Sequence, residues 1–188
     1  MSQPVEKFAP VAIALHWIIA ALLVLSALSG LGTVYIDDTR TSRMALEIHQ
    51  TIGLVIFLLA IARLYWRFTH TPPPPPKGYT RAQRIAAAVT HVTLYLFILG
   101  MPISGYTGLA ARGREIPVFG LINLPHLTPR SFDLSANAAT LHYYAQFAMY
   151  ALVALHVLAA LYHHFVLKDD VMRRMLPASK AALPGDTV

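Results

Sequence analysis

Hydrophobic positions along the chain gather into four long stretches, and the segments between them hold most of the charged residues. The stretches run approximately over residues 11–31, 45–65, 85–110 and 136–167. Each provides the ~20 apolar residues that a helix needs to cross a bilayer. The pattern therefore predicts four transmembrane helices.

The fourth stretch lies within a segment, residues 134–167, that has no Asp, Glu, Lys or Arg. A helix of this length would extend about 51 Å, whereas the hydrocarbon core of a bilayer is ~30 Å thick. We expect this helix to tilt or to protrude at one end of the bundle.

Composition also indicates an integral membrane protein. Hydrophobic residues make up 56% of the 188 positions and charged residues 13%, against about 25% charged residues in soluble domains. We expect one domain over residues 1–177 and a disordered tail over residues 178–188. No nucleic-acid-binding motif is visible, and contact with lipid headgroups accounts for the basic pI.

The distribution of positive charge predicts the orientation of the helices. Ten Lys and Arg residues lie on the side that holds the N-terminal segment, the second loop and the C-terminal segment, and five lie in the first and third loops. Segments rich in Lys and Arg remain in the cytoplasm. The expected fold is thus an all-α membrane protein, a four-transmembrane-helix bundle with both termini cytoplasmic.

Histidines within the apolar stretches are the candidate functional residues. His142 and His156 are fourteen residues apart, nearly four helical turns, so their imidazoles share one helix face about 21 Å apart. His16 and His49 lie in the first and second stretches. Any one of them could be a neutral histidine that donates to a backbone carbonyl. As a set they provide the four axial nitrogens that two bis-histidine haems require.

Antiparallel packing of the helices predicts which histidines pair. His49 and His142 both lie near the outer end of their helices, and His16 and His156 lie nearer the cytoplasm. His163 follows His156 by seven residues, so it would lie beside the inner haem, as a quinone or proton site or as a simple interfacial histidine. His91 could replace His16 or His156 as a ligand or bond to a quinone, and a packing role explains it equally well.

The absence of cysteine limits the cofactor chemistry. No thiolate is available to hold an iron–sulfur cluster, and no Cys-x-x-Cys-His motif can attach haem covalently. Any haem must therefore be held by ligation and packing.

Several motifs together resemble the bacterial cytochrome b561 family, over nearly the whole chain from about residue 7 to Pro177. They are Ala14-Leu-His16-Trp17, Glu47-Ile-His49, Leu141-His142, Leu155-His156, His163-His164 with Lys168-Asp169, and Arg173-Arg-Met-Leu-Pro177. The resemblance implies a four-helix bundle with two b-type haems in the bacterial inner membrane. Carried over to these positions, it implies His16 and His156 on one haem, His49 and His142 on the other, and His163 near a ubiquinone.

The best-understood enzyme of this family is a superoxide oxidase, which passes electrons from superoxide on the outer side to ubiquinone. A cluster of Arg112, Arg114 and Arg130 could draw the anion to the outer haem, or bind haem propionates instead. Two other hypotheses remain. The chain could be a membrane-anchor cytochrome that serves a partner dehydrogenase or hydrogenase, or a histidine-lined proton or metal transporter.

Overall fold

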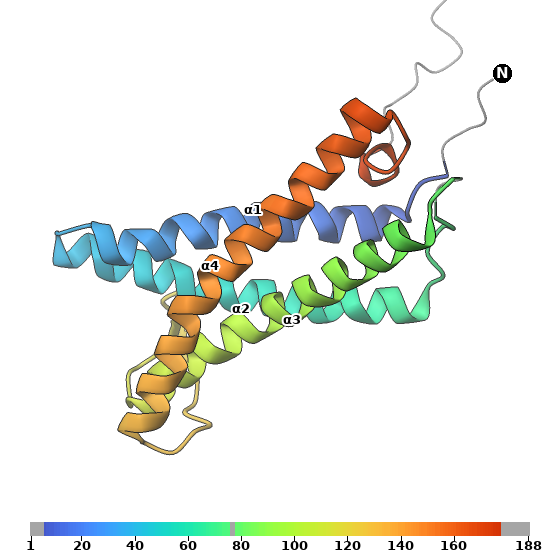
Figure 1. The fold of residues 1–188 in the computed structure, drawn as a ribbon. Coiled ribbons are helices and arrows are strands. Elements are labelled where there is room, and N and C mark those ends of the chain that lie inside the picture. The colour runs from blue at the N-terminus through green and yellow to red at the C-terminus, as the bar shows by residue number, and fades with distance from the viewer. Residues whose placement is uncertain (1–5, 76–77, 178–188) are drawn as a thin grey trace, which may run out of the picture.

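The computed structural model describes residues 6–75 and 78–177, so the predicted disordered tail lies outside the described residues. Four long helices make up most of this part of the chain (Figure 1). They are α1 (Pro10–Tyr35), α2 (Thr39–Thr69), α3 (Arg81–Ala111) and α4 (Phe132–Tyr162). All four are long and apolar enough to cross a membrane. The predicted class, an all-α membrane protein with four spanning helices, is therefore confirmed.

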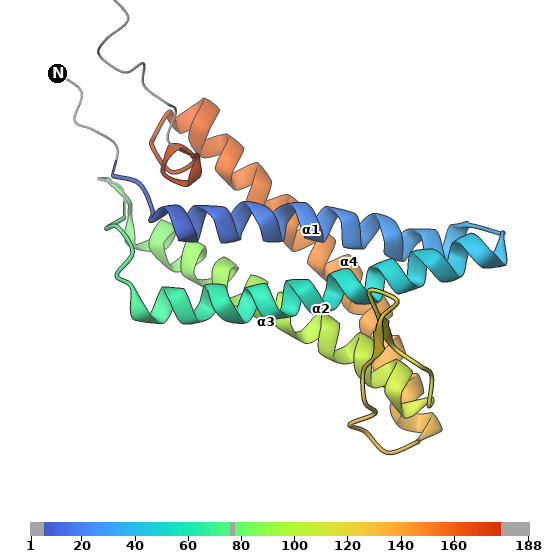
Figure 2. The ribbon, with the colours of Figure 1, turned by 180° about the vertical axis from the view of Figure 1, so that it is seen from behind.

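Two helical hairpins build the bundle. The most extensive contacts join α1 to α2 and α3 to α4, and α2 also packs against α3. The two hairpins cross, and they diverge at the end that carries their α1–α2 and α3–α4 connections (Figures 1 and 2). We call this the hairpin end, and we call the opposite end, which holds the start of α1 and the end of α4, the terminal end.

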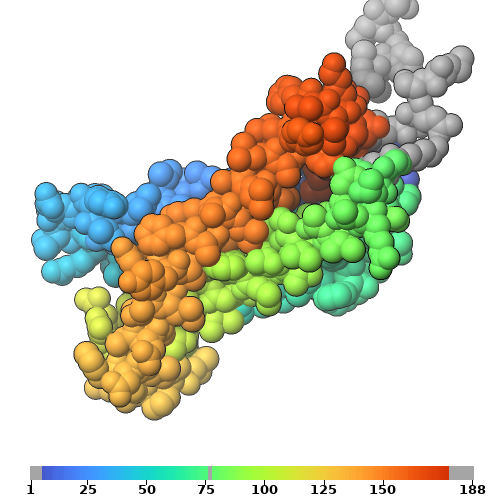
Figure 3. Space-filling model, in the orientation of Figure 1, coloured from blue at the N-terminus to red at the C-terminus, as the bar shows by residue number. Residues whose placement is uncertain are grey.

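The exterior of the bundle is apolar, as a surface in contact with lipid requires. Leu28, Leu58, Leu96 and Leu155, one from each helix, are all more than half exposed. In water, contiguous apolar surface of this kind would favour association. Figure 3 shows α4 lying along the visible face, beside α3 and across α1.

The first three helices extend beyond the apolar stretches that predicted them at both ends, whereas α4, expected over 136–167, begins at Phe132 and ends at Tyr162, where a π-helical turn follows it. The largest difference is in α2, expected over 45–65, which begins at Thr39 and ends at Thr69. Asp38 caps its first turn by accepting from Thr41 N at 2.7 Å. Hydropathy marks the part of a helix that lies in hydrocarbon, whereas capping and backbone hydrogen bonds continue the helix into the polar interface.

The third loop contains a short hairpin that the pattern of apolar residues does not predict. β1 (Pro117–Val118) pairs antiparallel with β2 (Ile122–Asn123). Ile116 and Val118 are buried, and Phe119 N donates to Thr51 Oγ1 of α2 at 3.3 Å. The loop thus folds back onto the bundle at the hairpin end.

The two chain ends pack together at the terminal end. A π-helical turn (His163–Leu167) follows α4, and a 3-10 turn (Arg173–Met175) follows it. The buried Arg174 donates from Nε to Glu6 O at 2.8 Å, and Trp17 Nε1 donates to Met175 O at 2.7 Å. The C-terminal segment is therefore fixed to the start of α1.

The two hairpins repeat the same contacts at equivalent positions. Residues of α3 correspond to those of α1 75 positions earlier, and residues of α4 to those of α2 93 positions earlier. In the first hairpin Ser42 Oγ donates to Thr33 O at 3.1 Å, and in the second Ser135 Oγ donates to Gly108 O at 2.7 Å. Further pairs are Ser29 and Ser104, Gly30 and Gly105, and His49 and His142.

Candidate haem and electron-transfer sites

His49 and His142 face each other across the bundle towards the hairpin end. Their ring centroids are 6.0 Å apart. His49 Nδ1 lies 2.8 Å from Ser26 O of α1, and His142 Nδ1 lies 3.0 Å from Met101 O of α3. Because a carbonyl only accepts, Nδ1 carries the proton in both rings and Nε2 keeps its lone pair. Both imidazoles are thus prepared to bind a metal through Nε2.

Two glycines make room for these imidazoles. A Cβ built on Gly30 would lie 3.1 Å from Cε1 and Nδ1 of His49, and one built on Gly105 would lie 3.1 Å from Cε1 of His142. Each glycine follows the accepting carbonyl by four residues, so it lies one turn along the same helix face. Each helix pair therefore positions its histidine in the same way. A backbone carbonyl accepts from the ring, and a glycine one turn later leaves space for it.

Three histidines meet nearer the terminal end. The ring centroid of His156 lies 6.2 Å from that of His16 and 5.6 Å from that of His91. His91 is the equivalent of His16 in the repeat, 75 positions later on α3. His156 on α4 thus lies next to both of the histidines that the sequence offered as its partner.

These distances suit a bis-imidazole metal site. With metal–nitrogen bonds of about 2.0–2.1 Å on each side, the centres of two opposed imidazoles lie roughly 6 Å apart. The separations of 6.0 Å for His49 and His142 and 6.2 Å for His16 and His156 match this value. The residues present therefore fit haem iron at two levels of the bundle.

Arg63 adds a cation to the terminal-end level, although the charge pattern of the chain indicated it only as a basic residue on the cytoplasmic side. Its Nη1 donates to Ala12 O of α1 at 3.0 Å, and its Nε donates to Tyr95 OH of α3 at 3.2 Å. Ala12 is one turn before His16, and Tyr95 is one turn after His91. The guanidinium is therefore held between helices beside the histidines. An ionisable residue inside a span was the available signal for its role.

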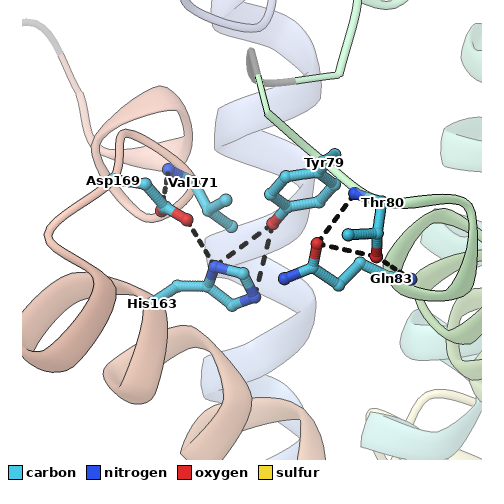
Figure 4. A network of polar contacts seen from close by, with 6 residues as sticks. All are labelled: Tyr79, Thr80, Gln83, His163, Asp169 and Val171. Carbon is cyan, nitrogen blue, oxygen red and sulfur yellow. Dashed lines mark hydrogen bonds and ion pairs between the residues drawn. The ribbon is translucent and has the colours of Figure 1, made fainter.

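His163 lies in a polar network of its own at the terminal end (Figure 4). Its Nδ1 is 2.5 Å from Asp169 Oδ2, and Tyr79 OH is 3.4 Å from its Nε2. Asp169 Oδ1 also accepts from Val171 N at 3.0 Å. Tyr79 OH is also 3.3 Å from Nδ1, but Nδ1 donates to the carboxylate, so Nε2 is the ring nitrogen to which the Tyr79 hydroxyl can donate.

Local backbone structure and burial shape this network. His163 begins the π-helical turn, and Lys168, with φ of 53°, ends it in the left-handed conformation. The resulting change of direction brings Asp169 back towards His163. Burial, and secondarily the Asp169 carboxylate, raises the pKa of the Tyr79 phenol. Tyr79 therefore keeps its proton at neutral pH and serves as a donor.

The structure divides the arginine cluster that the sequence suggested at the hairpin end. Arg112 and Arg130 line a cavity of about 290 Å³ next to the first turn of α4. Arg114 lines a different cavity, of about 360 Å³, together with Arg43, Glu47 and Glu115. Only the first of these cavities combines arginines with no lining carboxylate.

Four apolar helices with opposed histidines at two levels define a class of protein, a multi-span membrane cytochrome. A family model described as prokaryotic cytochrome b561 matches residues 7–178. The chain is 32% identical to cytochrome b561 homolog 2 of Escherichia coli strain K12, over 94% of each chain. It is also 32% identical to a protein of Yersinia pestis named probable superoxide oxidase CybB, over 93% of this chain and 98% of that one.

The chain therefore belongs to the prokaryotic cytochrome b561 family. It is a bacterial membrane haem protein that binds b-type haem, transfers electrons and acts as an oxidoreductase. The hypothesis of a histidine-lined transporter is replaced by this assignment.

Proposed function

We propose that the protein is a superoxide:ubiquinone oxidoreductase of the inner membrane. Two superoxide anions give up one electron each and leave as two O₂. Ubiquinone takes up these two electrons and two protons and becomes ubiquinol. The observation that carries the proposal is the pair of opposed-histidine sites at successive levels of one bundle, with a proton-bearing network at one end.

In this proposal the chain holds two b-type haems through four histidines. His49 and His142 bind the outer haem, and His16 and His156 bind the inner one. The Nδ1 contacts of His49 and His142 to backbone carbonyls support ligation through Nε2. Bound haem would supply a one-electron couple at each level, and histidines on both sides of the iron would restrict it to relaying electrons.

The inner end is proposed to receive ubiquinone beside His163. A quinone carbonyl accepts hydrogen bonds, and the quinone must gain protons as it is reduced. Asp169 and Tyr79 support this role because Asp169 accepts from Nδ1 and orients the ring, and the Tyr79 hydroxyl beside Nε2 is a donor from which a quinone carbonyl can accept. Asp169 positions the ring, and Tyr79 stays protonated beside it.

The outer end is proposed to receive superoxide near Arg112 and Arg130. Two guanidinium groups around one cavity, without a lining carboxylate, produce a local positive potential. The N-terminus of α4 also lies at this cavity, with Phe132 and the capping Ser131, although Asp133 in the same first turn offsets part of its positive end. This arrangement favours an anionic donor on the outer side.

The proposed reaction is tested on the purified protein in two stages. A pulse of superoxide should reduce the haems faster than the partner-free background, and added ubiquinone should then reoxidise them. Arg130→Gln should slow only the first stage, and more so at low ionic strength. If superoxide does not reduce the haems while ubiquinol does, the protein is a membrane-anchor cytochrome for another redox subunit.

Single histidine variants test the proposed ligation. His16→Ala, His49→Ala, His142→Ala and His156→Ala should each lower the haem content from two per chain to about one. His91→Ala should keep both haems. If the His91 variant loses the inner haem and the His16 variant retains it, His91 and not His16 is the ligand opposite His156.

A further inference from the structure

Arg63 is an intramembrane cation held in place by neutral groups. It lies six residues before the end of α2, about 9 Å along the helix. Its side chain is half-buried and points towards the other helices, where Ala12 O and Tyr95 OH accept from Nη1 and Nε. The guanidinium has five N–H donors, so donors remain for another acceptor.

The described part of the chain offers Arg63 no carboxylate. The ion pairs among the described residues join His163 to Asp169 and Arg173 to Asp170, and neither includes Arg63. Glu47, the acidic residue of α2 itself, is sixteen positions away from Arg63, about 24 Å along the helix. A charged side chain within a span is costly unless it is paired. Among the described residues Arg63 has no counter-ion, and its remaining N–H groups can donate to a bound anionic group.

The repeat shows where that group would lie. Arg63 is the equivalent of His156, 93 positions earlier. At the hairpin-end level the equivalent positions of α2 and α4 both hold a histidine, His49 and His142. At the terminal-end level α4 supplies His156 and α2 supplies Arg63 instead. Arg63 thus lies at the same level as His156. It gives α2 a cation at this level, where the hairpin-end level has the histidine His49.

We propose that Arg63 pairs with a propionate of the inner haem. Haem b carries two carboxylates, and guanidinium–carboxylate pairs can form two parallel hydrogen bonds. The bonds to Ala12 O and Tyr95 OH fix Arg63 one turn from His16 and one turn from His91, within the helices that surround the haem. Arg63 anchors this haem, and its positive charge favours the reduced state. The inference rests on the haem sites proposed above.

Charge removal at Arg63 provides the first test. Redox titration of the purified protein should resolve two haem components, and the inner one is identified as the component that His156→Ala removes. Arg63→Gln should lower the potential of this component and speed its loss to an apo-globin acceptor roughly tenfold. Arg63→Lys should keep the potential near the wild-type value. Arg67→Gln, one turn further on and exposed, removes the same charge from a position nearer the end of α2 and should lower the potential by clearly less than Arg63→Gln.

The propionate itself is tested by reconstitution with haem whose carboxylates are esterified. In the wild type, the esterified haem should lower the inner-haem potential to the value found for Arg63→Gln with ordinary haem. In Arg63→Gln, esterification should cause no further decrease in this potential. Additive effects of esterification and of Arg63→Gln would overturn the pairing. Unchanged inner potential and haem retention in Arg63→Gln would also overturn it, and would leave a lipid phosphate as the counter-ion. If Arg63→Gln does not fold, a wild type that is insensitive to esterification overturns the proposal.

Discussion

Gly105 determines whether the imidazole of His142 can reach its position against α3. An added Cβ would lie 3.1 Å from Cε1 and 3.3 Å from Nδ1 of a ring that is already tied to Met101 O. We therefore expect Gly105→Ala to displace this ring and to reduce haem content from two per chain to about one. The haem-to-protein ratio measures this.

Gly100→Ala is the matched control in the same helix. A Cβ at Gly100 meets no atom within 4 Å, and alanine is favoured over glycine in helices by about 1 kcal/mol. This variant should retain both haems and be slightly more stable. Equal haem loss in the two variants would show that Gly105 has no special role.

Asp169 is expected to matter for quinone reduction and for no earlier step. Asp169→Asn removes the carboxylate that accepts from His163 Nδ1. It should leave haem reduction by superoxide unchanged, slow haem reoxidation by ubiquinone about tenfold or more, and alter the pH profile of that second stage. Asp170→Asn, at the exposed neighbouring carboxylate, should change neither stage. Slowing of both stages by Asp169→Asn would indicate a purely structural role.

The sequence predicted which histidines are candidate functional residues, but it did not predict the groups that accept hydrogen bonds from them. Histidines within apolar stretches are recognisable because ionisable residues are rare in membranes. Their acceptors, the carbonyls of Ser26 and Met101, have no sequence signature because every residue carries a carbonyl. Asp169 was visible only as part of a motif, since its contact with His163 depends on the π-helical turn and the left-handed Lys168.

At the scale of the element, the caps of α2 and α4 occupy equivalent positions but differ in charge. Asp38 and Ser131 each accept from the backbone N–H three residues later. Hydrogen bonds from the Thr41 hydroxyl and N–H hold the pKa of Asp38 below its usual value. Its charged form therefore stabilises the folded state above the unfolded pKa, and this contribution is lost as the pH falls through the folded pKa.

We expect Asp38→Ala to lower the thermal unfolding midpoint at pH 7, and the difference from the wild type to shrink below about pH 4. Ser131→Ala should lower the midpoint by an amount that does not change with pH, because a hydroxyl cap does not titrate. Thermal scans of both variants across this range measure the two differences. A gap for Asp38→Ala that persists in acid would mean that its charge does not contribute.

The number of helices followed from the sequence, whereas their ends did not. The apolar stretch at 45–65 excluded the polar first turns of α2, where Arg40 and Arg43 lie, although they are helical. Charged residues lower mean hydropathy without interrupting backbone hydrogen bonds. The short β1–β2 hairpin was missed because its pairs are only two residues long and depend on packing against α2.

At the scale of the whole molecule, the repeat was hidden because few positions preserve residue identity. His16 and His91, or Ser29 and Ser104, are identical, but most residues between them differ. When equivalent positions of the two hairpins are compared, the two histidine levels differ in their residues. The level near the hairpin end is symmetric, with His49 and His142, and the level near the terminal end is not, because Arg63 stands opposite His156. The difference gives the bundle two distinct sites.

The orientation of the bundle decides which site meets the electron donor. By sequence, ten Lys and Arg residues belong to the side of the two termini and five to the side of the first and third loops, which predicts that the termini are cytoplasmic. A fluorescent protein fused after Val188 should therefore fluoresce, and alkaline phosphatase fused there should be inactive.

A protease site inserted at Gly120, where an added side chain would meet open space, should be cut in intact spheroplasts. The opposite result would place Arg112 and Arg130 in the cytoplasm and His163 outside. The proposed quinone site would then have to draw its protons from the outer side, and superoxide oxidation would take place within the cell.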